Sequence, residues 1–166
     1  LDLSKVEAGR LEVERVPCAV LQVVHEVADI MRLRAEEKGV RLVVALPEAL
    51  PATVLTDPAR VRQIVTNLIG NALKFTLQGE VTVTLHMVDT GRAGDAAPRL
   101  AIDIADTGIG IAADKLDAIF EPFVQAEAST TRQFGGTGLG LAISRRFARA
   151  LGGDVTVSSV PGQGST

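Results

Sequence analysis

FGGTGLGLAISRR (134–146) is the most informative stretch of the sequence, because its four glycines lead directly into a predicted helix. Backbone amides at a helix N-terminus, when no side chains cover them, form a site for anions such as phosphate. Each glycine also weakens a helix, so a purely structural reason for so many of them is poor. The stretch predicts a phosphate site at the start of a helix that runs from about 138 to 151. Its expected core face consists of Leu139, Ile143, Phe147 and Leu151.

A second cluster, ADTGIGI (105–111), lies at the end of a predicted strand over 99–106. The two-residue period of a strand places Asp106 on the same face as Ile102 and Ile104. A carboxylate at the end of an apolar stripe needs a hydrogen-bonding partner, and the amino group of adenine would serve. Gly108 and Gly110 would then let the backbone approach a flat ligand closely. Asp-Thr-Gly turns after strands are common, however, and taken alone the cluster fits such a turn better.

A third cluster lies on a helix that is predicted to start after Asp57, an N-cap residue followed by Pro58, and to end near Phe75. At about 100° per residue, one side of this helix presents Asn67, Asn71 and Lys74, with Gln63 beside them. The opposite, core-facing arc consists of Val61, Ile64, Val65, Leu68, Ile69 and Ala72. Carboxamide oxygens suit Mg²⁺ and a lysine beside them suits phosphate. A solvated polar face explains this cluster about equally well.

From the order of the predicted strands and helices, we expect an α+β fold: a two-layer sandwich of a mixed, mostly antiparallel sheet with helices on one face. Further helices are expected over 19–38 and 112–120, the first with a core face of Val20, Val23, Val24, Val27, Ile30 and Met31. The expected strands cover 11–14, 40–46, the surroundings of Val54 and Leu55, 80–88, 99–106 and 154–160. Residues 121–136 are long for a structureless loop and are interpreted as a mobile lid.

Two other phosphate-binding motifs fit less well. A P-loop requires Gly-Lys-Ser/Thr, and no lysine follows a glycine in this chain. GIGIAA (108–113) matches the dinucleotide fingerprint, but that fold requires a second parallel strand ending in an acidic residue about twenty positions later. The chain has FEPFVQAEASTTRQ there instead, so Rossmann-type binding is the weaker interpretation.

Composition excludes several classes of protein. The chain has no Trp or Tyr, five Phe and a net charge of −3, which argues against a nucleic-acid surface. Its apolar runs fall short of the roughly 18 residues of a membrane span, no signal peptide opens it, and the lone Cys18 excludes a disulfide framework. The chain opens on LDLSKVEAG without Met and closes on PGQGST, a turn that no further element follows. We therefore expect a cytoplasmic piece of a longer protein.

Four motifs, in order, resemble those of sensor histidine kinases. NLIGNALKFT (67–76) is similar to their asparagine box, DTGIGI (106–111) and GGTGLGLAIS (135–144) to their two glycine boxes, and FEPF (120–123) to their phenylalanine box. The opening LDLSKVEAGRLEVE is similar to the end of the second helix of their dimerisation domain. The resemblance implies that residues 1–10 end that helix and its linker, and that 11–166 form an ATP-binding catalytic domain, a fold shared with DNA gyrase and large heat-shock chaperones. It also implies that the last strand of that domain is missing after PGQGST.

The resemblance implies a role for each matching residue. Asp106 would bind the adenine amino group, Asn71 would ligate Mg²⁺ with Asn67 nearby, and Lys74 would reach a phosphate. Phe120 and Phe123 would anchor the lid, and Arg132 on the lid would contact the γ-phosphate. The remaining implied nucleotide-binding residues are Phe75, Gly108, Gly110, Ile111, Gly136, Thr137, Gly138, Leu139, Gly140 and Leu141.

Departures from the family's pattern decide which partners the resemblance implies. The phosphoacceptor motif is absent, since His25-Glu26 is followed by Val27-Ala28, and we interpret His25 as a surface residue and His86 as a strand residue. Asn67 stands where gyrase-type relatives carry a catalytic Glu. The resemblance therefore favours transfer from Mg-ATP to a histidine on the dimerisation helix of a homodimer, then to a receiver domain, which the stretch after 121 suggests is fused downstream. The rival functions are a clamp ATPase and a receptor module without kinase activity.

Overall fold

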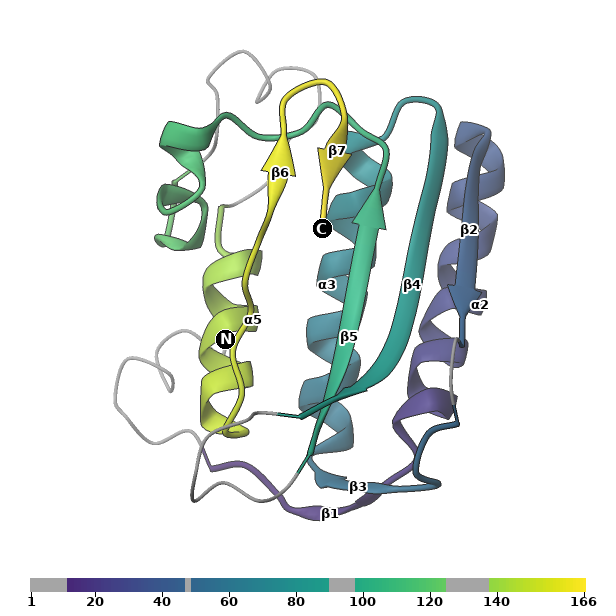
Figure 1. Ribbon diagram of the computed structural model, residues 1–166, viewed down its shortest axis with the longest axis vertical. Helices are drawn as coiled ribbons and strands as arrows, with labels where there is room; N and C mark the ends of the chain where they lie inside the picture. The colour runs from purple at the N-terminus through teal and green to yellow at the C-terminus, as the bar shows by residue number, and fades with distance from the viewer. Residues whose placement is uncertain (1–11, 47–48, 90–97, 125–137) are drawn as a thin grey trace.

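The computed structural model describes residues 12–46, 49–89, 98–124 and 138–166. A five-stranded sheet of order β2-β4-β5-β7-β6 forms one layer, and helices α2, α3 and α5 lie side by side against one of its faces (Figure 1). The β2 strand runs parallel to β4, and the other neighbours are antiparallel. The predicted α+β sandwich is confirmed. No helix within these ranges is both long and apolar enough to cross a bilayer.

The helices begin and end at the signals in the sequence. The α3 helix spans Pro58–Phe75, and the Asp57 side chain accepts hydrogen bonds from the first-turn amides of Ala59 and Arg60. The α2 helix spans Val20–Lys38 and ends at Gly39, whose φ of 68° is the left-handed conformation that glycine adopts without strain. The α5 helix spans Gly140–Ala150, two residues shorter at its start than expected.

The central strands are β2 (Val40–Ala45), β4 (Gly79–Val88) and β5 (Arg99–Asp106), close to the predicted ranges. Two-residue strands β6 (Ser159–Val160) and β7 (Gly164–Ser165) extend the sheet. A separate two-stranded sheet, β1 (Val16–Cys18) with β3 (Val54–Thr56), crosses one end of the sandwich (Figure 1). The stretch PGQGST, expected to be a turn alone, therefore also contains the short strand β7.

The core lies between the sheet and the helices. Alternate residues of β4, namely Val81, Val83 and Leu85, are fully buried against Val65 and Ile69 of α3 and their neighbours on α2. Phe147 of α5 is also fully buried, and the guanidinium of Arg60 lies 4.6 Å from its ring centroid. The apolar face of each helix thus covers one part of the same sheet.

Some expected elements are placed differently. The strand expected over 11–14 is β1 at Val16–Cys18 instead, because its pairing partner β3 lies opposite those residues. Ile30, expected in the core, is 71% exposed. The buried stripe of α2 continues through Met31, and Ile30 lies about 100° around the helix from that residue.

Two further segments form less regular structure than expected. The helix expected over 112–120 consists of two 3₁₀ turns, η1 (Ala113–Lys115) and η2 (Ala118–Phe120), a geometry common in short connectors. Of the strand expected over 154–160, only β6 is regular, although Ser158 exchanges two backbone hydrogen bonds with Thr166. The expected lid falls largely on 125–137, outside the described residues.

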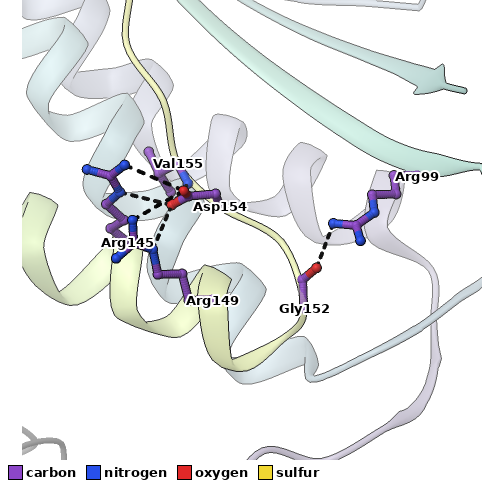
Figure 2. Close-up of polar contacts among 6 residues, drawn as sticks. All are labelled: Arg99, Arg145, Arg149, Gly152, Asp154 and Val155. Atoms are coloured by element: carbon purple, nitrogen blue, oxygen red, sulfur yellow. Dashed lines mark hydrogen bonds and ion pairs between the residues drawn. The ribbon is translucent and has the colours of Figure 1, made fainter. Parts of the chain in front are cut away.

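The end of α5 is fixed by charged side chains (Figure 2). Arg145 and Arg149 both donate to Asp154, with Nε to Oδ1 distances of 2.9 and 3.2 Å, and Arg99 donates to the carbonyl of Gly152 at 2.7 Å. The Arg145 hydrogen bond, followed by that of Arg149, lowers the pKa of Asp154 to about 2. The carboxylate thus stays ionised at neutral pH and ties the segment after α5 to the helix.

Candidate nucleotide-binding site

The polar face of α3 forms the centre of the candidate site. Asn67, Asn71 and Lys74 are each partly buried. The opposite face of the helix supplies the core residues Val61, Val65, Ile69, Ala72 and Leu73. Four of the six residues of the predicted core arc are therefore buried, whereas Ile64 and Leu68 are only partly so, and Leu73 is a core residue that the predicted arc did not include.

Lys74 lies in a partly apolar environment. Its ammonium is 4.8 Å from the centroid of the Phe75 ring, and burial lowers the pKa of Lys74 from its ordinary value. Burial disfavours a charged group, and an anion beside it favours that group. A phosphate placed next to Lys74 would therefore offset the cost of burying its charge.

Asn67 connects α3 to α5. Its Nδ2 donates to Ser144 Oγ at 2.9 Å, and a Cβ added to Gly140 would lie 2.3 Å from its Oδ1. Gly140 and Ser144 are four residues apart, so they lie on the same face of α5. The Asn67 carboxamide thus packs directly against the first turns of α5.

Ser144 was missed by the sequence analysis, although it is only 2% exposed. The expected core face of α5 was partly wrong, because Phe147 is fully buried but Leu139, Ile143 and Leu151 are only partly so. The other buried residues of this helix are Ala142, Ser144 and Ala148. Small residues allow α5 to approach α3 closely, and a serine four positions after a glycine that opens a helix is the signal that could have been noticed.

Asp106 lies at the end of β5, opposite Val81 on one neighbouring strand and Ser165 on the other. Its Oδ1 accepts a hydrogen bond from the Gly108 amide at 2.8 Å. Burial raises the pKa of Asp106, and hydrogen bonds from the amides of Gly108 and Ser165 partly oppose this effect. A partly buried carboxylate with acceptor capacity left is suited to an amino group, as the sequence predicts.

The glycines after Asp106 contact the chain itself. A Cβ on Gly108 would lie 2.4 Å from the carbonyl oxygen of Phe75, and one on Gly110, whose φ is +69°, would lie 2.2 Å from that of Val160. Ile109 also donates its amide to the Phe75 carbonyl at 3.2 Å. The close approach that these glycines allow in the structure is therefore between backbone segments, which holds the Asp106 loop against the end of α3. Ile111 is held similarly, by its amide on Ser159 Oγ at 2.8 Å.

The two predicted phenylalanine anchors differ in their surroundings. The Phe120 ring is partly buried, and the Arg145 guanidinium lies 4.4 Å from its centroid. Phe123 has a φ of 64° and a side chain that is 69% exposed. Its amide donates to the Gly138 carbonyl at 3.1 Å, which brings together the two sides of the segment 125–137. Arg132, Gly136 and Thr137 lie outside the described residues.

The remaining glycine-box residues lie at the start of α5. Gly138 has a φ of +69°, Leu139 is the N-cap residue, and Gly140 and Leu141 begin the helix, with no capping side chain on the first turn. Uncapped first-turn amides can bind an anion. The α3 helix reaches from the start of α5, at Asn67, to the Asp106 loop, at Phe75, a rise of about 12 Å for eight residues. The uncapped amides of α5 and the Asp106 loop thus lie near opposite ends of this stretch of α3.

Comparison with known proteins gives the family. Residues 56–166 match the family described as histidine kinase-, DNA gyrase B- and HSP90-like ATPases. The chain belongs to this ATPase family. Within it, the chain is 42% identical over 166 residues to the autoinducer 2 sensor kinase/phosphatase LuxQ of Vibrio parahaemolyticus and 38% identical over 166 residues to the signal transduction histidine-protein kinase BarA of Escherichia coli. These matches cover 100% of the chain but 19% and 18% of the two relatives, so it spans about a fifth of their length.

A solved structure agrees with this assignment to the ATPase family. The crystal structure of full-length ShkA in complex with AMPPNP superposes with a TM-score of 0.83 at 39% identity, over 98% of this chain and 32% of that one. The catalytic domain of the histidine kinase ThkA, at 20% identity and a TM-score of 0.74, shares the fold. The sequence-based assignment to the histidine kinase group of the family is confirmed.

Proposed function

We propose that the chain is the catalytic domain of a sensor histidine kinase that transfers the γ-phosphoryl group of Mg-ATP to a histidine on a separate dimerisation domain. The observation that carries this proposal is similarity to named sensor kinases along the whole chain, including residues 1–55, which precede the family match. The match to ShkA, whose crystal structure was determined in complex with AMPPNP, supports ATP as the nucleotide.

The proposed nucleotide lies along α3. Its adenine amino group would donate to Asp106, Ile111 would contact the base, and Phe75 would lie at the base end of the helix. Lys74 would pair with a phosphate, and the amides from Gly138 to Leu141 would hold the phosphate chain. Arg132, Gly136 and Thr137 are proposed to complete the phosphate site, and Phe120 and Phe123 to anchor the lid.

The residues of the site are suited to a magnesium ion whose other ligands are phosphate oxygens. Mg²⁺ is commonly held by one or two protein oxygens together with substrate phosphates and water, and the Asn71 carboxamide oxygen is a suitable ligand on the α3 face. No cluster of three His, Cys, Asp or Glu within the described ranges is arranged to hold a metal by itself. When bound, the ion would neutralise charge on the phosphates during transfer.

Transfer to another protein group is favoured over hydrolysis by water. The residue beside the proposed phosphates is Asn67, a carboxamide that donates to Ser144 and cannot act as a general base. His25 is exposed on α2. His86 alternates with the buried residues of β4 and has its Nδ1 3.7 Å from Asp103, so it faces away from the helices. The acceptor histidine is therefore proposed to come from a dimerisation helix, to which residues 1–10 would be the linker.

Residues 11–166 would then form the catalytic domain, a monomer by itself and part of a homodimer in the full protein. The phosphoryl group would pass onward to an aspartate of a receiver domain, and the whole exchange would take place in the cytoplasm, where the domain meets ATP.

Replacing Asn71 by alanine should weaken ATP binding roughly tenfold in the presence of Mg²⁺, the size expected for loss of a hydrogen-bonding group beside a charge. Binding in EDTA should change by no more than about twofold, since the side chain is proposed to act through the metal. Isothermal titration calorimetry in both conditions checks this.

Gln63→Ala is the matched control, because Gln63 lies on the same helix but is exposed and hydrogen-bonded to Arg60. Equal losses for Asn71→Ala with and without Mg²⁺ would exclude the metal role for Asn71.

A further inference from the structure

The carbonyl groups of the last turn of α3 all have hydrogen-bond donors, and those of Leu73, Lys74 and Phe75 have donors from other parts of the chain. The carbonyls at the C-terminal end of a helix lack intrahelical donors, although that of Ala72 is still within reach of the C-cap amide. The Ala72 carbonyl accepts from Thr76, through its amide at 3.1 Å and its hydroxyl at 2.7 Å. The Phe75 carbonyl accepts from the amide of Ile109 at 3.2 Å. The two carbonyls between them, of Leu73 and Lys74, accept hydrogen bonds from a single side chain, that of Lys38.

Lys38 reaches these carbonyls from a different helix. It is the last residue of α2, directly before Gly39, and its Nζ donates to the Leu73 carbonyl and, at 3.2 Å, to that of Lys74. Burial, followed by repulsion from Arg34, lowers the pKa of Lys38. A partly buried ammonium is stabilised there because the C-terminal end of a helix carries a partial negative charge.

The contact acts on the part of α3 that carries the proposed site. Lys38 holds the backbone of Lys74, whose side chain is the proposed phosphate ligand. The next carbonyl, of Phe75, is held by Ile109, and the amide before Ile109, of Gly108, donates to the Asp106 carboxylate. An unbroken series of hydrogen bonds and peptide links thus runs from α2, through the end of α3, to the proposed adenine acceptor.

We propose that Lys38 is a positioning residue for the nucleotide site: it fixes the last turn of α3, and with it the Lys74 ammonium and the Asp106 loop. The proposal rests on the proposed function, because it assumes that ATP binds along α3. Lys38 itself does not touch the nucleotide, so its loss changes affinity by changing the geometry of the groups that do.

The test compares four single variants of the chain with the unaltered protein. Lys38→Met keeps the aliphatic stem and removes the donors, and Lys38→Arg restores donors. Val24→Ala, at a fully buried position of the same helix, lowers stability without touching the end of α3. Arg34→Met removes a neighbouring exposed charge. For each variant, calorimetry with Mg²⁺ gives the affinity for ATP, and thermal unfolding gives the midpoint temperature. The NMR chemical shift of the Ile109 amide is measured without ligand.

We expect Lys38→Met, at a temperature where it is fully folded, to bind ATP roughly five- to tenfold more weakly, as for loss of charge-assisted hydrogen bonds. Its Ile109 amide should shift, and Lys38→Arg should recover most of the affinity. Val24→Ala and Arg34→Met should bind normally, even though Val24→Ala lowers the midpoint. If Lys38→Met does not fold, Lys38→Gln takes its place.

Several results would overturn the proposal. These are normal affinity in a folded Lys38→Met, an equal loss in Val24→Ala, which would make the effect one of stability alone, or no recovery in Lys38→Arg. If the unaltered chain fails to bind ATP, it is the proposed function that falls.

Discussion

Replacing Asp106 by alanine should lower the affinity for ADP by about 1.5–3 kcal/mol, the usual contribution of a hydrogen bond to a charged group. The reason is that its partly buried carboxylate is the proposed acceptor for the adenine amino group. Asp106→Asn should also bind weakly, because an amide can still accept the Gly108 hydrogen bond but can turn a donor toward the base. Calorimetry on folded variants measures both losses.

Asp103→Ala is the matched control for these two variants. Asp103 lies three residues earlier on β5 and is exposed, beside His86. It should leave the affinity unchanged. Full affinity in Asp106→Asn and Asp106→Ala would exclude Asp106 as the adenine acceptor.

Replacing Gly140 by alanine should destabilise the fold by about 1–3 kcal/mol, the usual cost of forcing an extra methyl group into a packed interface. The new Cβ would lie 2.3 Å from Asn67 Oδ1, so α5 must move away from α3 or the Asn67 side chain must turn. Either change also disturbs the proposed phosphate site, and ATP affinity should fall with stability. Denaturant unfolding and calorimetry measure the two effects.

Replacing Gly70 on the neighbouring helix α3 by alanine should change stability in the opposite direction. A Cβ there would meet nothing within 4 Å, and alanine in a helix interior is favoured over glycine by about 0.5–1 kcal/mol. Gly70→Ala should therefore raise the free energy of unfolding. A Gly140→Ala variant as stable as the unaltered chain would contradict the close packing of α3 on α5.

The parts of the fold that sequence analysis predicted well are those with local signals. Asp57 and Pro58 mark the start of α3, and its apolar period marks its core face, because both depend only on residues within a few turns. The alternation in β4 and β5 is local in the same way. Ile30 was assigned wrongly because an apolar side chain near a helical stripe carries no local sign of whether another element covers it.

In the candidate site, too, local motifs could be read from the sequence but contacts between distant segments could not. Asn67, Asn71 and Asp106 could be proposed as site residues from the motifs alone. The Asn67–Ser144 hydrogen bond could not, because it joins residues 77 positions apart and depends on how α5 packs on α3. The contact partners of Gly108 and Gly110 depend likewise on where α3 and β6 end. Lys38, at the end of an amphipathic helix, looks in the sequence like any solvated lysine, and only the packing of α2 beside α3 brings it to the carbonyls.

The proposed function is that this chain binds ATP and transfers its γ-phosphoryl group to a histidine of another domain. Attack requires an imidazole within about 3–3.5 Å of the γ-phosphorus, and we expect neither His25, exposed on α2, nor His86, beside Asp103 on β4, to reach it. The direct measurement is incubation of the chain with γ-labelled ATP and Mg²⁺, alone and with a separate protein that carries the proposed upstream dimerisation helices. We expect the chain to stay unlabelled and a histidine of the added helices to carry the label. Strong labelling of the chain alone at His25 or His86, or unlabelled helices beside a chain that binds ATP, would contradict the proposed function.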